Sequence, residues 1–156
     1  MNLQETLNRI GPLDASAMTG AKERLDSLLK PPGSLGKLED LAVQLAGIYG
    51  EPRPQPRPKA IVMMAADNGV YEEGFNSYPQ EITKAVAELA GRGLIGVSVL
   101  ARLAGCRLAV VDIGVKDGTD GAHIIQRRVR AGTSNIAKGP AMKREEAVKA
   151  IETGVE

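Results

Sequence analysis

AIVMMAADNG (residues 60–69) and RLAVVDIGV (residues 107–115) are the two stretches that decide the fold class. Each is a short apolar run that has, near its end, an aspartate with a glycine two residues later. Runs of this kind are typical of parallel strands that are covered on both faces. Two segments that can form helices, at 80–90 and 94–104, lie between the runs. The order therefore predicts a strand, a helical crossover and a second strand parallel to the first.

Further elements extend this pattern toward the C-terminus. A third strand is predicted at 124–130, and a last helix from about Met142 that carries Glu145 to Ile151. Two or three apolar strands with so few helices cannot cover both faces of a parallel sheet. We therefore predict an α/β fold with a Rossmann-like parallel sheet and flanking helices, incomplete in this chain and part of a larger domain. Such a chain should self-associate or expose a large apolar patch.

The N-terminal third has a different organisation. Apolar residues recur at helical spacing after Asp14 and stop before Pro31, so an amphipathic helix with Asp14 as its N-cap is predicted there. A second amphipathic helix is predicted after Gly36. GEPRPQPRPK then alternates proline with polar residues, which favours an extended, polyproline-like tether. The predicted division is a helical subdomain at 1–49, a proline-rich linker at 50–59 and the N-terminal part of the parallel α/β domain at 60–156.

The composition excludes several classes of partner. The 156 residues include 20 basic and 19 acidic side chains, so the net charge of +1 gives no overall attraction to nucleic acid or to an anionic membrane. Cys106 is the one cysteine and His123 the one histidine, so neither an internal disulfide nor a soft-ligand metal cluster is expected. No leader segment and no membrane-spanning apolar run is recognised, so we expect a cytoplasmic protein.

Polar residues follow both predicted strands and form the first candidate site. Ligands of open parallel sheets bind beyond the carboxyl ends of the strands, where Asp67, Asn68 and Asp112 fall. Their carboxylates could accept hydrogen bonds from sugar hydroxyls or from the backbone amides of neighbouring loops, and acid–base work would need a pKa raised by burial. The alternative is that each aspartate caps the turn after its own strand.

Two loops form the second group of candidates. GFNSYPQEIT (74–83) places Pro79 at a predicted helix start and Ser77 near the N-cap, an end that can take an anion or can be an ordinary capped helix. RAGTSNIAKGPAM (130–142) combines small residues with a lysine and could cradle a phosphate, but it matches neither the GxxxxGK[ST] nor the GxGxxG spacing. The KREE run at 143–146 is interpreted as a solvated first helical turn. The scarcity of aromatic residues, three tyrosines and one phenylalanine, predicts mainly aliphatic walls for any bound heterocycle.

Six stretches together resemble the nicotinate-nucleotide:dimethylbenzimidazole phosphoribosyltransferase family of cobalamin nucleotide-loop assembly. They occur in the family's order over nearly the whole chain. They are LLKPPGSLGKLEDLA (28–42), ADNGV (66–70), YPQEIT (78–83), VLARLAG (99–105), VDIG (111–114) and GTSNIAKGPAM (132–142). The first would be a rigid corner between two helices of the N-terminal subdomain. Asn68 stands where the family commonly has histidine, which removes a titratable imidazole but keeps a donor and an acceptor.

The resemblance implies a reaction and a site. Family members transfer the phosphoribosyl group of nicotinate mononucleotide to 5,6-dimethylbenzimidazole, which gives α-ribazole 5′-phosphate and nicotinate, without a metal or other cofactor and as homodimers. The implied base site includes the loop and helix with Ser77, Tyr78 and Val86, and Asp67 and Asn68 would shape the crevice. Family members are about twice as long, and their catalytic glutamate falls in the half beyond Glu156.

Three interpretations stay open at this stage. The chain is the N-terminal portion of such a transferase and inactive alone, or it is a non-catalytic module that binds a base or nucleotide, or it is a half-enzyme that needs a partner chain. The intact mass, compared with the length of the encoding reading frame, separates the first from the other two. A second α/β polypeptide that copurifies would separate the third from the second.

Overall fold

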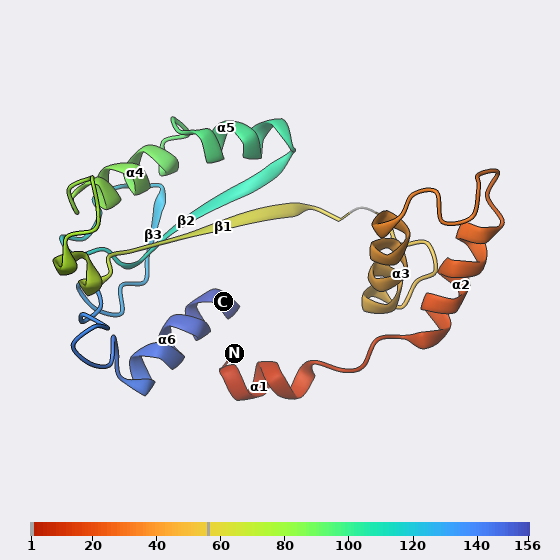
Figure 1. Ribbon diagram of the computed structural model, residues 1–156, viewed down its shortest axis with the longest axis horizontal. Helices are drawn as coiled ribbons and strands as arrows, with labels where there is room; N and C mark the ends of the chain where they lie inside the picture. The colour runs from red at the N-terminus through yellow and green to blue at the C-terminus, as the bar shows by residue number, and fades with distance from the viewer. Residues whose placement is uncertain (1, 56) are drawn as a thin grey trace. The chain divides into compact units, whose positions relative to one another are not determined.

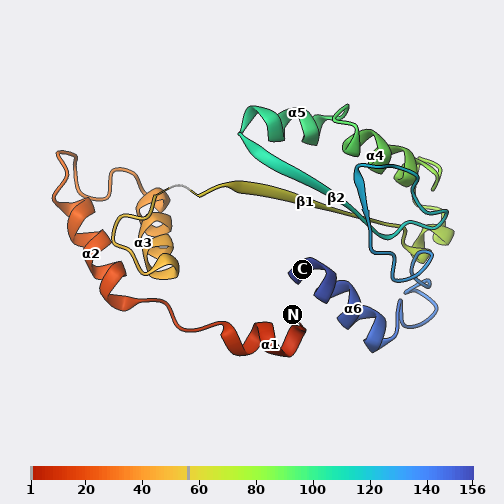
Figure 2. The same cartoon turned by 180° about the vertical axis from the view of Figure 1, so that it is seen from behind.

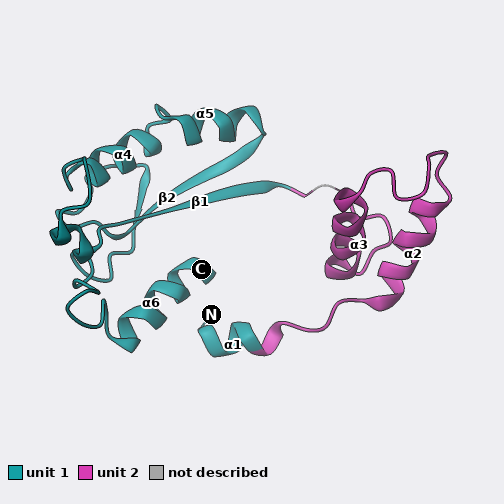
Figure 3. Ribbon diagram, in the orientation of Figure 1, with its two compact units in different colours: residues 1–7, 58–156 teal, residues 8–57 magenta. Residues whose placement is uncertain are grey.

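The computed structural model describes residues 2–55 and 57–156, which form two compact units. Residues 8–57 make up one unit, and the N-terminal residues up to Leu7 join residues 58–156 in the other (Figure 3). The roles of 1–49 as a subdomain and of 50–59 as a linker stay predictions.

The larger unit is built on a three-stranded parallel sheet in the order β1-β2-β3 (Figure 1). Its strands are β1 (Lys59–Ala66), β2 (Cys106–Gly114) and β3 (Ile124–Gln126). The α/β fold class and the parallel pairing predicted from the apolar runs are thus confirmed. The register of β1 on β2 shifts between Ala65 and Ala66, so that Ala66 lies opposite Gly114. The shift marks the carboxyl end of the sheet, where the chain leaves for its loops.

The third strand is shorter than the predicted 124–130. After Gln126 the chain still contacts β2, because the amide of Arg127 donates to the carbonyl of Asp112 at 2.9 Å and that of Val129 to Ile113 at 3.0 Å. These bonds no longer follow a regular ladder. The segment instead bends toward the carboxyl end of the sheet. There the amide of Gly132 donates to the carbonyl of Gly114, at the end of β2, at 3.0 Å, and that of Thr133 donates to the carbonyl of Asp67, after β1, at 2.9 Å.

Two helices of the crossover cover one face of the sheet: α4 (Ile82–Gly91) and α5 (Gly96–Leu103) (Figure 1). The core between them and the sheet uses small and β-branched residues. Ala87 and Ala90 are fully buried, and their short side chains let α4 approach the sheet closely. The buried partners on the strands and loops are Ala65, Val110, Val115 and Ile124.

The opposite face is largely open. There Val62, Met64 and Ile125 are 56%, 41% and 44% exposed. This open apolar face agrees with the expectation that the helices of this chain are too few to cover both faces of the sheet. α6 (Arg144–Val155) lies on this side in both views (Figures 1 and 2), and its Gly154 approaches Met64 near the C-terminal end.

A short N-terminal helix, α1 (Leu3–Arg9), was not expected from the sequence. Its start carries a reciprocal cap that the apolar period does not reveal. The amide of Glu5 donates to Asn2 Oδ1 at 2.8 Å, and the amide of Asn2 donates to Glu5 Oε2 at 3.1 Å. The amide of Leu3 also donates to Glu152 Oε1 at 2.9 Å, which links the start of this helix to α6.

The smaller unit pairs α2 (Ala15–Asp26) with α3 (Lys37–Tyr49). Asp14 is the N-cap of α2, as predicted, and accepts from the amide of Ala17 at 2.9 Å. α2 ends at Asp26, before Pro31 and Pro32, which exclude a helix that continues through them.

The corner between α2 and α3 is held by one ion pair. Lys30 Nζ lies 2.9 Å from Glu39 Oε1, and both side chains are more than four-fifths buried. The same carboxylate oxygen accepts from the amide of Leu35 at 3.1 Å, and the bond from Lys30, with that amide, holds the pKa of Glu39 below its ordinary value. Gly33 and Gly36 take positive φ angles of 72° and 53° in the turns between. The proline-rich corner is therefore a fixed structure.

Most described residues between α3 and β1 are exposed, but Pro52 and Arg57 make contacts that a free tether would lack. Pro52 lies against Gly20 of α2, where an added Cβ would meet its ring at 3.1 Å. The guanidinium carbon of Arg57 lies 4.2 Å from the centre of the Tyr49 ring, and its Nη2 is 3.6 Å from Glu51. Apolar surface on α2 and α3 explains the difference, because it offers the prolines something to pack on.

Candidate active site

The aspartate at the end of β2 is a structural centre. Asp112 is completely buried, and its carboxylate accepts four hydrogen bonds. Oδ1 accepts from the amides of Gly114 and Val115 at 3.1 and 2.9 Å, and Oδ2 accepts from the amide and the hydroxyl of Thr119, both at 3.0 Å. Asp112 therefore caps the turn after its own strand, which is the alternative to a ligand-binding role.

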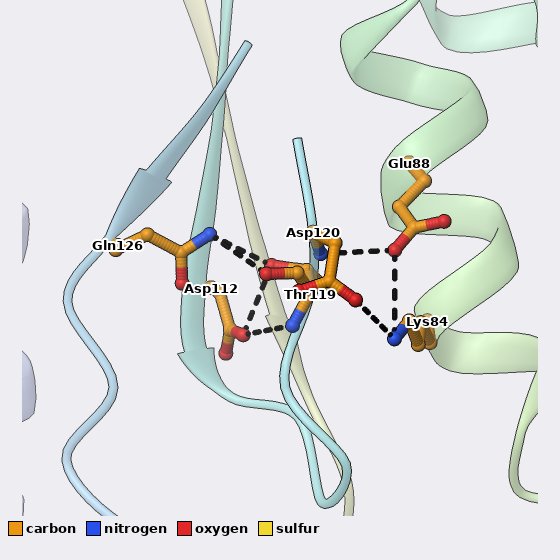
Figure 4. A network of polar contacts seen from close by, with 6 residues as sticks. All are labelled: Lys84, Glu88, Asp112, Thr119, Asp120 and Gln126. Carbon is orange, nitrogen blue, oxygen red and sulfur yellow. Dashed lines mark hydrogen bonds and ion pairs between the residues drawn. The ribbon is translucent and has the colours of Figure 1, made fainter. Parts of the chain in front are cut away.

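Further polar contacts extend this centre to α4 (Figure 4). Gln126 Nε2 donates to the hydroxyl of Thr119 at 3.0 Å. Asp120 Oδ2 lies 2.8 Å from Lys84 Nζ, and the amide of Asp120 donates to Glu88 Oε1 at 3.0 Å. The bond and charge of Lys84 hold the pKa of Asp120 below its ordinary value, and Asp120 raises that of Lys84. The loop after β2 is therefore anchored on both sides.

The aspartate at the end of β1 is placed differently. Asp67 is 5% exposed, and its Oδ2 accepts from the amide of Lys116, in the loop after β2, at 2.8 Å. Its amide donates to the carbonyl of Gly114, and its carbonyl accepts from the amide of Thr133. Asp67 thus binds three segments together. A carboxylate held by a backbone amide in this way is suited to fixing the shape of a crevice.

The short 3₁₀ helix η1 (Gly69–Glu73) begins two residues after Asp67 and packs against residues 132–135, which we call the GTSN loop. A Cβ on Gly69 would lie 2.5 Å from the carbonyl carbon of Ser134 and 2.6 Å from the nitrogen of Asn135, so only glycine fits here. The amide of Gly69 donates to Thr133 Oγ1 at 3.1 Å. Two stretches singled out in the sequence, ADNGV and GTSNIAKGPAM, therefore meet in the fold.

A pocket of about 350 Å³ lies beside Asp67 and η1, a size in the range of small-ligand sites. It is formed by the end of β1, by η1, by the loop to α4 and by the first turn of α4. Its lining residues are Ala66, Asp67, Asn68, Val70, Tyr71, Phe75, Asn76, Tyr78, Pro79, Gln80, Ile82 and Thr83. We call this the aromatic pocket.

The walls of the aromatic pocket correct the expectation of mainly aliphatic surroundings. Three of the four aromatic residues of the chain, Tyr71, Phe75 and Tyr78, line it. Because they follow β1 in loops, they are absent from the core and gather at one place on the surface. Planar rings with polar neighbours suit a flat heterocycle, which can stack on the rings and donate or accept at its edge.

The five site residues predicted from the sequence divide into two groups. Asp67, Asn68 and Tyr78 line the aromatic pocket, whereas Ser77 and Val86 are not among its lining residues. The prediction that Ser77 lies near the N-cap of the following helix is wrong, because α4 begins at Ile82 with Glu81 at the N-cap. The turn before α4 starts at Pro79, whose carbonyl accepts from the amide of Ile82 at 3.2 Å.

Sequence reasoning missed Tyr71, Phe75 and Gln80 as lining residues. The available signal was the density of aromatic residues in 71–78 of a chain that has few elsewhere. Tyr71 and Gln80 also border a second, wider pocket of about 580 Å³, which Lys116 and the backbone around Gly132 complete. Lys116 Nζ lies 3.3 Å from Gln80 Oε1. The two pockets thus share a wall.

The KREE run is more than a solvated turn. Glu146 Oε2 accepts from the amide of Lys143 at 2.8 Å, which caps the start of α6, and it lies 3.2 Å from Arg130 Nη1. The capping bond, with the charge of Arg130, keeps the pKa of Glu146 below its ordinary value. The run therefore fastens α6 to the loop that follows β3.

A hollow of about 340 Å³ also lies between α4, α5 and β2. Its walls are mainly small residues, and the hydroxyl of Ser98 in it donates to the carbonyl of Ala90 at 2.9 Å. Cys106 and His123 stand at this hollow, away from the carboxyl-end loops. Among residues 2–55 and 57–156, no group of three or more acidic, histidine or cysteine side chains could hold a metal ion, and no helix has the length and apolarity to cross a membrane.

The fold and the site can now be compared with known proteins. The chain belongs to a family of phosphoribosyltransferases, whose model it matches over residues 10–156. It is 51% identical over 155 residues to the nicotinate-nucleotide–dimethylbenzimidazole phosphoribosyltransferase of Alkaliphilus metalliredigens, and 50% identical over 156 residues to that of Ruminiclostridium cellulolyticum. The resemblance stated from the sequence motifs is thereby confirmed.

A solved structure agrees with the sequence relatives. The crystal structure of the nicotinate-nucleotide–dimethylbenzimidazole phosphoribosyltransferase of Thermus thermophilus superposes with a TM-score of 0.85 at 40% identity. The match covers 91% of this chain and 43% of that one. The two sequence relatives are matched over 99% and 100% of this chain and over 44% of their own lengths. The chain therefore spans less than half the length of these relatives.

Proposed function

We propose that the aromatic pocket is the base slot of a phosphoribosyl transfer from nicotinate mononucleotide to 5,6-dimethylbenzimidazole. The observation that carries this proposal is the gathering of Tyr71, Phe75 and Tyr78 at the carboxyl end of the sheet. A flat, largely apolar base gains from stacking on such rings. The names of the relatives give the two substrates.

The residues of this chain have binding and shaping roles in the proposal. Tyr78 and Phe75 form the walls, Asn68 offers an amide donor and acceptor to the edge of the base, and Asp67 holds the floor in place. The base needs a carboxylate to remove its ring proton, and the carboxylate of Asp67 already accepts from Lys116. In the proposal that group is a glutamate beyond Glu156, so residues 1–156 bind the base but do not turn over alone.

Ser77 and Val86 take a lesser part in the proposal. Ser77 belongs to the same loop as Tyr78, and Val86 lies one turn into α4 from the pocket-lining Ile82. Both would support the pocket wall. We extend the proposal to the whole enzyme, as a cytoplasmic homodimer.

A transfer assay tests the proposal. The chain is mixed with nicotinate mononucleotide and 5,6-dimethylbenzimidazole, and released nicotinate and α-ribazole 5′-phosphate are measured by chromatography. We expect no turnover by residues 1–156, turnover when the chain is extended to the length of its relatives, and binding of the base by both. Turnover by residues 1–156 alone would place the general base within them and contradict the role given to the missing glutamate.

The same assay separates the proposal from a non-catalytic base-binding module. The observation that favours the module is that Asp67 is the one acidic residue in the lining of the aromatic pocket, and its Oδ2 already accepts from the amide of Lys116. A module would bind the base and stay inactive after extension. A half-enzyme would become active only with its partner chain.

A further inference from the structure

We propose that Asn135 is a positioning residue that sets the aromatic wall of the base slot through Glu73. The inference rests on the function proposed above and adds a specificity role for the GTSN loop. Asn135 is not among the residues that line the pocket. Its effect on the base therefore passes through η1.

Asn135 is built into the structure as a connector. Its side chain is 8% exposed, and both ends of its amide are used. Nδ2 donates to Glu73 Oε1 at 2.6 Å, and Oδ1 accepts from the amide of Ala137 at 3.0 Å. The short bond to a carboxylate is of the charge-assisted kind, which is stronger than a neutral one. The buried amide thus ties the end of η1 to the loop.

The other end of η1 is fixed by the same loop. Gly69 donates to Thr133 Oγ1 at 3.1 Å and lies too close to the loop backbone for any side chain. Between these two fixed ends stand Val70 and Tyr71, which line the aromatic pocket. A clamp at both ends leaves Tyr71 little room to shift.

The clamp also sets the residues after η1. Gly74, with a φ of 76°, ends the helix, and its amide donates to the carbonyl of Tyr71 at 3.1 Å. Phe75 follows directly and lines the same pocket. Release of Glu73 would therefore move two of the three rings. Lys138 also approaches Glu72 and Glu73, at 3.0 and 3.7 Å, but these exposed pairs hold less firmly.

Ring placement matters most for the methylated edge of the base. A slot with fixed walls distinguishes 5,6-dimethylbenzimidazole from benzimidazole by the packing of two methyl groups. A slot with a mobile wall loses that distinction sooner than it loses stacking, because stacking tolerates sliding of the rings. The ratio of the two affinities is therefore the readout of positioning.

The test measures dissociation constants of both bases by calorimetry on residues 1–156. Asn135→Asp replaces the donor with a second carboxylate facing Glu73. We expect about tenfold weaker binding of 5,6-dimethylbenzimidazole and a ratio between the bases that falls toward one. Adding Glu73→Gln to Asn135→Asp reverses donor and acceptor and should restore the affinity and the ratio. Ile136→Ser, at an exposed neighbour in the same loop, is the matched control and should behave as wild type.

Hydrogen exchange at the amides of 69–74 accompanies the binding data. Faster exchange there in Asn135→Asp, reversed in the double variant, is the expected result. If Asn135→Asp fails to fold, Glu73→Ala removes the same bond from its partly exposed side and should give the same loss of discrimination. Equal affinities and ratios in wild type and variants would overturn the inference and leave the proposed function standing. No binding by the wild type would overturn the base slot itself.

Discussion

The loops that follow β1 and β2 begin alike and end differently. An aspartate stands near the carboxyl end of each strand, with a glycine two residues later. Asp112 is completely buried and accepts four hydrogen bonds from residues 114–119, whereas Asp67 accepts from the neighbouring loop. The loop after β2 is held by the buried carboxylate of Asp112 and by the contacts of Asp120 with α4, whereas the loop after β1 is held by Lys116 and by residues 132–135. In the segment after β1, Asp67 and Glu73 make the holding bonds, and the three rings of the segment line the aromatic pocket.

The largest effect should come from the loop after β2. Asp112→Asn places an amide donor among four donors, so two lose their acceptor, and we expect the free energy of unfolding to fall by about 3 kcal/mol. Asp67→Asn can still turn its oxygen toward Lys116 and should lower it by about 1 kcal/mol. Urea denaturation measures both. The exposed Asp117→Asn, in the same loop as Asp112's partners, is the control with no expected change. Equal losses for the two aspartates would erase the contrast between the loops.

Glycine substitutions sharpen the contrast next. Gly69→Ala forces a Cβ to within 2.6 Å of the GTSN backbone, and we expect a loss of about 2 kcal/mol together with weaker base binding. Gly121→Ala, in the loop after β2, would meet only the tip of Ile124 at 3.4 Å and should change stability by less than about 0.5 kcal/mol. Thermal denaturation and calorimetry check the pair. A neutral Gly69→Ala would show that η1 is not held by residues 132–135.

The rings should affect binding and leave stability almost unchanged. Tyr78 is 69% exposed, so Tyr78→Ala should alter the free energy of unfolding by less than about 0.5 kcal/mol. Its loss of stacking should weaken binding of 5,6-dimethylbenzimidazole about tenfold. Asp120→Asn, in the loop after β2, should leave this affinity as it is. Weaker binding in Asp120→Asn would contradict the expectation that the base is bound by the loop after β1 and not by the loop after β2.

Acid should produce the smallest effect, and the same one in both loops. Lys84 lowers the pKa of Asp120, and Lys138 lowers that of Glu72. A carboxyl with a lowered pKa in the folded state adds stability above its unfolded pKa, and this is lost as the pH falls below about 4. Both pairs are exposed, so the loss is minor and shrinks in salt. Asp120→Asn and Glu72→Gln should each reduce the drop in melting temperature between pH 7 and pH 3.5, and an unchanged drop would argue against the pairs.

The sequence was sufficient for the elements whose signal is local. The apolar runs predicted β1 and β2, Asp14 predicted the start of α2, and Asp67 and Asn68 were placed correctly at the end of a strand. The failures have a different origin. β3 stops early because the following residues bond to β2 irregularly, which no periodicity reports.

The site was predicted in outline and missed in detail for the same reason. Gly69 and Asn135 are 66 residues apart in the chain, and no local pattern in either stretch predicts that they are in contact. Tyr71 and Phe75 line the pocket from η1 and from the residue after Gly74, and η1 contacts residues 133–135 through Gly69. The N-cap position predicted for Ser77 was wrong because Pro79 starts a turn and α4 itself begins only at Ile82, whereas the binding role of Ser77 stays a prediction.

The parallel pairing of β1 with β2 has a consequence for the rate at which the chain acquires its structure. Before the first hydrogen bond between β1 and β2 can form, the segment that contains η1, α4 and α5 must close into a loop. The conformational entropy of that segment is therefore lost before any strand contact can compensate for it. α2 and α3, by contrast, are neighbours in the chain and meet across one corner. The helical pair should therefore form early in refolding and the sheet late. Until β2 arrives, the VMMAA segment of β1 is an unpaired apolar strand, and association between chains during that interval competes with folding.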